Sequence, residues 1–148
     1  MNEVRLCKTL FLAEHLGGSF YDRFAARVDN SDVAGTFYEF AGDEHHHAKW
    51  YADWLRARNH EPPNPTAPDA LLIPSLHLLL APQSLDLKLR VFAQTEAAAA
   101  RHLTSLAQKI RDPELRSIVE KTIPAEREHS LWYQLEGRTM LRSADLKR

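Results

Sequence analysis

The sequence has few of the features that would assign it to several common classes of protein. A single cysteine, Cys7, excludes an internal disulfide, and closely paired cysteines are absent. Lys and Arg number 19 against 20 Asp and Glu, so there is no basic excess that would bind nucleic acid. The longest apolar stretch, residues 70–81, is interrupted by Pro74, Ser75 and His77 and is too short to span a bilayer. The first residues are polar and contain no apolar signal segment, so we expect a cytoplasmic protein.

The sequence also lacks the apolar–polar alternation of strands, and its apolar residues recur at helical spacing instead. Short connections make consecutive helices antiparallel neighbours, and the long middle connection can run back along the bundle. We therefore predict an all-α fold in one domain, 1–148: a four-helix bundle of two antiparallel helical hairpins joined by one long crossover. The expected helices cover about 3–28, 32–58, 84–111 and 113–137, and the crossover covers about 59–83, with a helical turn or two and a polar, frayed tail after Gly137.

Each of the four apolar stripes carries one glutamate, which is unusual because burying an unpaired carboxylate is costly. These residues are Glu14, Glu44, Glu96 and Glu126. His47 and His129 follow the second and fourth of them by three residues, and residues three apart share one face of a helix. Within the run of three histidines, His47 is therefore expected to face inward with Glu44, while His45 and His46 turn toward the flank or solvent.

The glutamates and histidines recur at constant spacing. Glu44 lies 30 residues after Glu14, Glu126 lies 30 after Glu96, and an offset of 82 relates the two halves. The same offset places EHHHAKWY (44–51) on EREHSLWY (126–133), which indicates an internal repeat of a helical hairpin. About 0.6 Glu-x-x-His pairs are expected by chance, so the shared upstream glutamate is what makes the pattern specific. Antiparallel pairing then places all four glutamates at one level.

Six side chains at one level predict a site for two metal ions. The predicted ligands are Glu14, Glu44, His47, Glu96, Glu126 and His129. Four carboxylates balance two divalent cations, and carboxylate-rich ligation with one imidazole per metal suits iron, or alternatively manganese, better than zinc. This is the ligand arrangement of the carboxylate-bridged dinuclear bundles.

On these residues the chain resembles the ferritin-like superfamily, over about residues 5–137, and its length and shape are most similar to the small rubrerythrin-like proteins. The resemblance implies a di-iron centre that carries out redox chemistry with O2 or peroxide, using an external electron donor. Rubrerythrins carry a further glutamate one turn after the third-helix ligand, where this chain has alanines 97–100, and a rubredoxin-type cysteine domain is missing. The pattern of Glu96 followed six residues later by His102, together with the apolar crossover, is similar instead to the pattern in demethoxyubiquinone hydroxylase.

Three functions therefore stay open: an oxidase or peroxidase, a hydroxylase of an organic, quinone-like substrate, and metal binding or storage without turnover. An apolar tunnel from Glu14 and Glu96 to the surface would favour the hydroxylase.

Several residues near the predicted ligands have two interpretations. Asp43 either orients a histidine of a neighbouring helix or is solvated, and His102 is either near the metals or at the edge of the bundle. Tyr51 and Tyr133 are packing residues or have a redox or gating role. The leucine-rich run from Leu71 to Leu80 is a lid over the bundle or the contact of a homodimer, with membrane contact as the minority interpretation.

Overall fold

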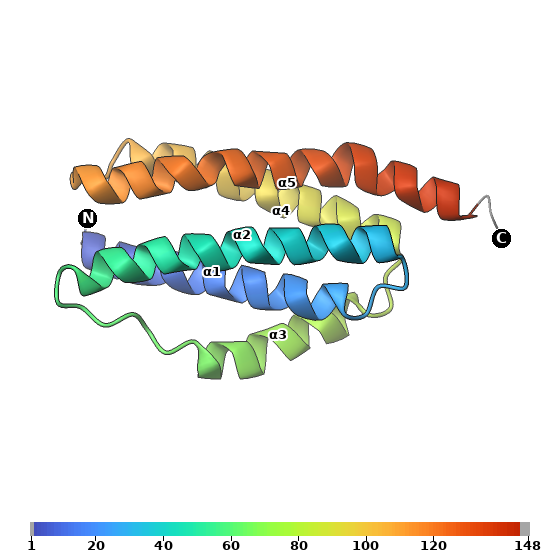
Figure 1. Cartoon of the computed structure of the whole chain (residues 1–148), viewed down its shortest axis with the longest axis horizontal. Helices are drawn as coiled ribbons and strands as arrows, with labels where there is room; N and C mark the ends of the chain where they lie inside the picture. The colour runs from blue at the N-terminus through green and yellow to red at the C-terminus, as the bar shows by residue number, and fades with distance from the viewer. Residues whose placement is uncertain (1, 146–148) are drawn as a thin grey trace.

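A computed structural model describes residues 2–145, with side chains described for all of them except 68–70, 136–138 and 140–145. This part of the chain forms helices only: α1 Glu3–Ala25, α2 Ser31–Arg56, α3 Thr66–Leu80, α4 Leu85–Ala107 and α5 Pro113–Asp145. α1 pairs with α2, α4 pairs with α5, and the two hairpins meet where α2 lies against α5 (Figure 1). The predicted all-α ferritin-like bundle of two helical hairpins joined by a long crossover is confirmed.

Ser84 and Asp112, residue types that favour the N-cap position, precede two of the helices. Ser84 Oγ accepts a hydrogen bond from the backbone N–H of Leu87 at 3.2 Å. Asp112 Oδ1 does the same for the N–H of Leu115 at 2.9 Å, and Pro113 follows as the first residue of α5. Each cap satisfies an N–H group that has no partner within its helix, which stabilises the helix by about 1 kcal/mol.

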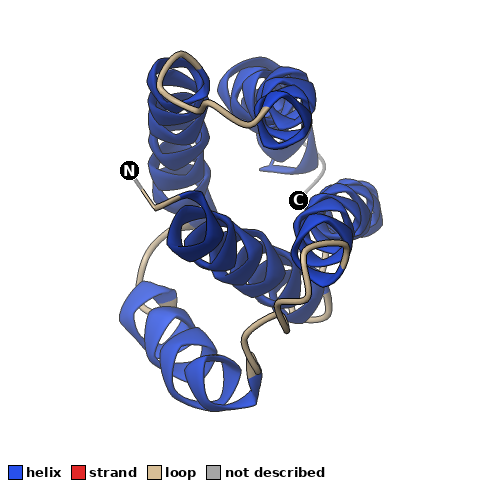
Figure 2. Cartoon of the chain, turned by 90° about the vertical axis from the view of Figure 1, so that its left-hand side faces the viewer, coloured by secondary structure: helices blue, strands red, loops and turns tan. Residues whose placement is uncertain are grey.

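The crossover differs from the expected turn or two, because it contains the 15-residue helix α3. α3 lies outside the bundle of the other helices, against α1 (Figures 1 and 2). Ile73 is buried there, and the His77 ring stacks on the Phe20 ring with centroids 4.8 Å apart. These contacts supply the apolar burial that a short isolated helix lacks in water.

The helix ends also differ from the expected ones. α2 ends at Arg56. Three residues later, Asn59 adopts a left-handed backbone conformation with φ of 59°, which asparagine tolerates after a helix. α4 stops at Ala107 rather than near residue 111. α5 continues through Gly137 to Asp145, beyond the end expected near residue 137. One glycine inside a helix costs only about 1 kcal/mol relative to alanine, which a long helix can absorb.

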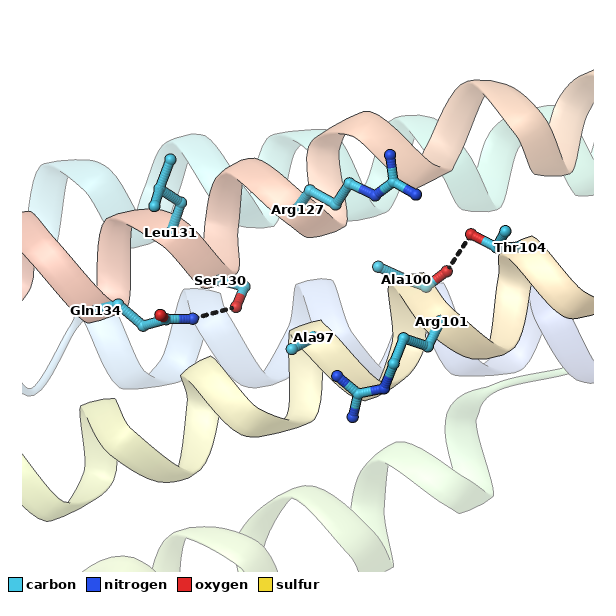
Figure 3. A pocket seen from close by; sticks show the side chains of 8 residues that line it. All are labelled: Ala97, Ala100, Arg101, Thr104, Arg127, Ser130, Leu131 and Gln134. Carbon is cyan, nitrogen blue, oxygen red and sulfur yellow. Dashed lines mark hydrogen bonds between the residues drawn. The ribbon is translucent and has the colours of Figure 1, made fainter.

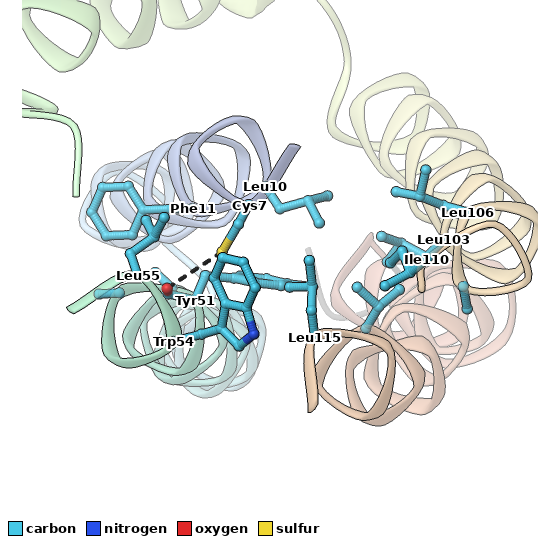
Figure 4. Close-up of a cluster of buried hydrophobic side chains, with 14 of the residues drawn as sticks. Cys7, Leu10, Phe11, Tyr51, Trp54, Leu55, Leu103, Leu106, Ile110 and Leu115 are labelled. Carbon is cyan, nitrogen blue, oxygen red and sulfur yellow. Dashed lines mark hydrogen bonds between the residues drawn. The ribbon is translucent and has the colours of Figure 1, made fainter. Parts of the chain in front are cut away.

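The core consists of two clusters, one on each side of the glutamate level. The first contains residues that precede Glu14 and follow Glu44, such as Cys7, Tyr51 and Leu55, and it is largely aliphatic (Figure 4). The second contains residues that follow Glu14 and precede Glu44 and is largely aromatic; its aromatic members are Phe20, Tyr21, Phe24, Phe37, Phe40, Phe92 and Tyr133. The polar side chains thus lie between two apolar layers that exclude water from both ends.

Among residues 2–145, no helix has both the length and the apolar character needed to cross a bilayer.

Candidate metal centre

The six residues predicted as ligands are all buried, with at most 6% of each exposed to solvent. They come from α1 (Glu14), α2 (Glu44 and His47), α4 (Glu96) and α5 (Glu126 and His129). Buried carboxylates are rare unless they are paired or bind a cation. Their burial at one level of the bundle therefore needs a compensating charge.

The side chains form two groups whose ligand atoms lie within 4.8 Å of one another. One group contains Glu14, Glu44, His47 and Glu126, and the other contains Glu44, Glu96 and His129. Glu44 belongs to both groups, so its two carboxylate oxygens can face both. Each group has one histidine, as the duplicated Glu-x-x-His spacing predicts.

Helix phase separates the three consecutive histidines in the way the sequence predicts. His47 is 4% exposed, and its Nδ1 lies 3.1 Å from Glu14 Oε2. His45 is half-buried at the flank, with Nε2 2.9 Å from an oxygen of Asp22. His46 is exposed, and its ring lies against Trp50.

Asp43 contacts His129, as expected if it orients a histidine of a neighbouring helix. Its Oδ2 lies 3.2 Å from His129 Nε2, across the interface between α2 and α5. The Phe40 ring covers the same imidazole, with centroids 4.0 Å apart. Because Nε2 bonds Asp43, Nδ1 is the nitrogen left to face the carboxylates.

Tyr21 is a residue near the site that the sequence analysis missed. Its hydroxyl donates a short hydrogen bond to Glu96 Oε1, which joins α1 to α4. The only signal in the sequence was its position two turns after Glu14, on the same stripe as the core residues. The offset of 82 that relates the two halves places Leu103 at the equivalent position, so the repeat could not reveal it.

The glycine pair in α1 was also missed. A Cβ atom on Gly17 would lie 2.9 Å from Glu44 Oε2, and one on Gly18 would lie 2.6 Å from the His45 ring. A methyl group at either position would therefore displace these two side chains, so the glycines leave room for Glu44 and His45 in their present positions. Two glycines inside a helix are unfavourable for helix formation, by about 1 kcal/mol each relative to alanine.

The remaining residues with two interpretations are placed as follows. His102 is exposed, at the edge of the bundle. Tyr51 and Tyr133 are fully buried, and burial raises the pKa of both phenols above its ordinary value. The Tyr133 hydroxyl has no hydrogen-bond partner among the described residues. Cys7 is a buried core residue whose thiol donates to the carbonyl of Tyr51 at 3.4 Å.

Without a cation, the electrostatics of the site favour protonated carboxyl groups. Desolvation, and then the neighbouring Glu14 carboxylate, raise the pKa of Glu44 well above its ordinary value. Burial is also the main cause of the raised pKa of Glu96 and of Glu126, and Glu44 adds to it for Glu126. Burial lowers the pKa of His129 despite the opposing effect of Asp43, which favours the neutral imidazole that a metal requires.

The donor set fits two divalent cations. His129 Nδ1 is buried and has no hydrogen-bond partner among the described residues, and Glu44 Oε1 lies 3.6 Å from it. A metal ion would use this nitrogen and displace the protons that the buried carboxyl groups otherwise hold. Four carboxylates would balance the charge of two such ions.

Comparison with known proteins agrees with this arrangement. The sequence profile of the family described as Rubrerythrin matches residues 9–136, and no rubredoxin domain is found in the chain. Neither a curated protein nor a solved structure matches the chain. The match covers most of the chain, including all six clustered side chains, and the buried Glu and His clusters are typical of a dimetal site in this family. The chain therefore belongs to the rubrerythrin family.

Proposed function

We propose that the chain binds two metal ions through the six clustered residues and carries out redox chemistry with O2 or peroxide. Iron is the first choice of metal and manganese the alternative, because carboxylate-rich ligation with one imidazole per metal suits both. The observation that carries the proposal is the joining of two buried ligand groups through Glu44. Membership of the rubrerythrin family supports O2 or peroxide as the oxidant.

The residues around the site have separate tasks in this proposal. Two adjacent redox metals, when bound, supply the electrons that reduce the oxidant. Glu44, which belongs to both ligand groups, would hold both metals, and His47 and His129 would each supply a nitrogen to one of them. Asp43 holds the imidazole of His129, and the Tyr21 hydroxyl holds Glu96. The apolar layers above and below exclude water, which strengthens every electrostatic interaction inside the site.

Electrons for repeated turnover must come from outside the chain. The sequence carries no recognisable flavin, haem or iron–sulfur motif. An external protein or small-molecule donor is therefore part of the proposal.

The test starts with metal analysis of protein purified with and without air. The protein is then loaded with Fe(II) without air and mixed with peroxide or O2 while absorbance and peroxide consumption are followed. We expect about two metals per chain and peroxide consumption that continues when a reductant is supplied. Retention of metal without any consumption would assign metal binding alone, and many more than two metals per chain would assign storage.

A second candidate function, oxidation of an organic substrate, is favoured by one observation. A cavity of about 510 Å³ reaches all four glutamates and is lined mainly by apolar side chains. O2 and peroxide are too small to need such a space.

A further inference from the structure

The cavity lies between α1, α3 and α4. Its inner end is formed by the four clustered glutamates, and its outer part by leucines of α3 such as Leu72, Leu76 and Leu79. Tyr21, Thr95 and His102 are the other polar lining residues, and the rest of the lining is apolar. Its volume lies within the range of about 300–1,000 Å³ that is typical of sites for small organic ligands.

The cavity exists because small residues occupy facing positions on two helices. α1 contributes Ala13 and Gly17, and α4 contributes Thr95 and Ala99, each pair four residues apart and therefore on one helix face. On the opposite side of the centre, the rings of Phe40 on α2 and Trp132 on α5 are in contact, with centroids 5.6 Å apart.

The composition of the lining restricts what can bind. No Lys or Arg among the residues with described side chains lines the cavity. The four carboxyl groups at its inner end would balance the charge of the two proposed metal ions, so no net positive charge would remain for an anionic group. The apolar lining between the α3 leucines and the glutamates is complementary to a hydrocarbon chain. Leu72 and Leu79 are 50% and 70% exposed, so the outer end opens to solvent and a flexible chain can enter.

We propose that this cavity binds an uncharged organic molecule with a hydrocarbon chain, with the chain along the α3 leucines and one end beside the clustered glutamates. The proposal rests on the proposed metal centre, because the ligand's inner end would lie where an oxidant is activated. It names the substrate class of that centre. It also gives α3 a role: this helix closes the outer side of the cavity.

The test measures binding of neutral probes to the metal-loaded protein. Nile red, an uncharged apolar dye, reports occupation through its fluorescence, and hexanol, decanol and tetradecanol compete with it. We expect saturable binding of the dye, displacement by decanol, and a change in the absorption of the metal centre when decanol binds. The spectral change matters because occupation of the outer leucines alone would not produce it.

Two variants fill the cavity from opposite helices. Ala99→Phe and Ala13→Phe should each weaken decanol binding by about tenfold or more, with metal content and melting temperature close to those of the parent protein. Ala97→Phe is the matched control, since Ala97 is on the same helix as Ala99 and equally half-buried, but lines a groove between α4 and α5 (Figure 3). The use of two filling variants keeps the test decisive if one of them fails to fold.

Several results would overturn the proposal. These are the absence of saturable binding, an equal effect of Ala97→Phe, or no effect of either filling variant. The proposal would also be overturned if the Leu78→Asp substitution abolished dye binding and changed the protein from dimer to monomer in a sedimentation experiment. Leu78 is 76% exposed and does not line the cavity, so that result would assign the α3 leucines to contact with a second copy of the chain.

Failure of this proposal is distinguishable from failure of the metal centre. Dye and decanol binding by a protein that holds no metal would keep the cavity assignment and remove the redox function. Two metals per chain with no decanol binding would do the reverse.

Discussion

The two sides of the glutamate cluster are built in opposite ways. On the side of α2 and α5, Asp43 bonds His129 across the interface, and the rings of Phe40 and Trp132 close the space. On the side of α1 and α4, small residues leave a cavity whose outer part is covered by α3. Over the described residues, the backbones of α2 and α5 lie close together, whereas the backbones of α1 and α4 are farther apart.

The difference shows that the internal repeat duplicates the ligands but not their surroundings. The repeat places Ala125 at the position equivalent to Asp43, and Leu103 at the position equivalent to Tyr21. Each supporting group therefore occurs once. A symmetric set of ligands thus has one side that fixes a histidine and another that a molecule can enter.

The largest expected effect is loss of metal from both sides at once. Glu44→Ala should lower metal affinity by about 100-fold or more, because loss of a ligand exceeds the cost of losing an outer hydrogen bond. Glu126→Ala should act similarly, since Glu126 is the α5 counterpart of Glu44 in the repeat. Metal analysis after dialysis measures this, with exposed Glu128→Ala as the control. Full occupancy in the Glu44→Ala, Glu126→Ala double variant would refute the site.

Removal of the metals should destabilise the fold. Metal at about 100 times its dissociation constant contributes about 2.7 kcal/mol, or roughly 5–10 °C in melting temperature for a chain of this size. The pKa values of Glu44, Glu96 and Glu126 are raised in the metal-free fold, so these groups stabilise it below their unfolded pKa values. That stability is lost as the pH rises toward their folded pKa values.

The metal-free protein should accordingly be less stable at pH 8 than at pH 5, and added metal should raise its melting temperature more at pH 8. Thermal unfolding followed by circular dichroism measures both. Equal melting temperatures with and without metal at both pH values would mean that the carboxylates are not clustered.

The consecutive histidines provide an internal comparison of helix phase. His47→Ala should weaken metal binding and any turnover by about tenfold or more, and His129→Ala should do the same for the other half. His45→Ala and His46→Ala should leave two metals per chain, because these rings face the flank and the solvent. If His46→Ala weakened metal binding and His47→Ala did not, the inferred helix phase would be wrong.

The closed side can be weakened alone by removing Asp43. Asp43→Ala should reduce the affinity of one metal of the two by about tenfold, since it frees the His129 ring. A metal titration resolved into two steps measures this, and Glu39→Ala, one turn earlier and also exposed, is the control. Equal weakening of both steps would show that Asp43 does not act through His129.

The smallest effect is expected from the hydroxyl that joins α1 to α4. Tyr21→Phe removes the hydrogen bond to Glu96, which contributes about 1 kcal/mol, or a factor of about five in affinity. Tyr133→Phe is the matched control, because that hydroxyl is buried and has no hydrogen-bond partner in the described part of the chain. The same titration distinguishes the two, and a larger effect of Tyr133→Phe would reverse the roles given to these tyrosines.

The sequence by itself determined the helical hairpins and the burial of the six predicted ligands. These features follow from short-range rules: helical periodicity places residues three and four apart on one face, and antiparallel pairing converts equal spacing into equal height. The ends of the helices were less predictable. A helix can end at a glycine such as Gly137 or continue through it, and packing decides between these outcomes.

Only the tertiary structure decided which side of the centre is closed and which is open. Asp43 meets His129 across 86 positions of sequence, and Tyr21 meets Glu96 across 75, so neither contact has a local signal. The cavity depends on the facing of Ala13 and Gly17 with Thr95 and Ala99 and on the position of α3 above them. Such a space is defined by the relative placement of three helices, and periodicity within each helix does not specify that placement.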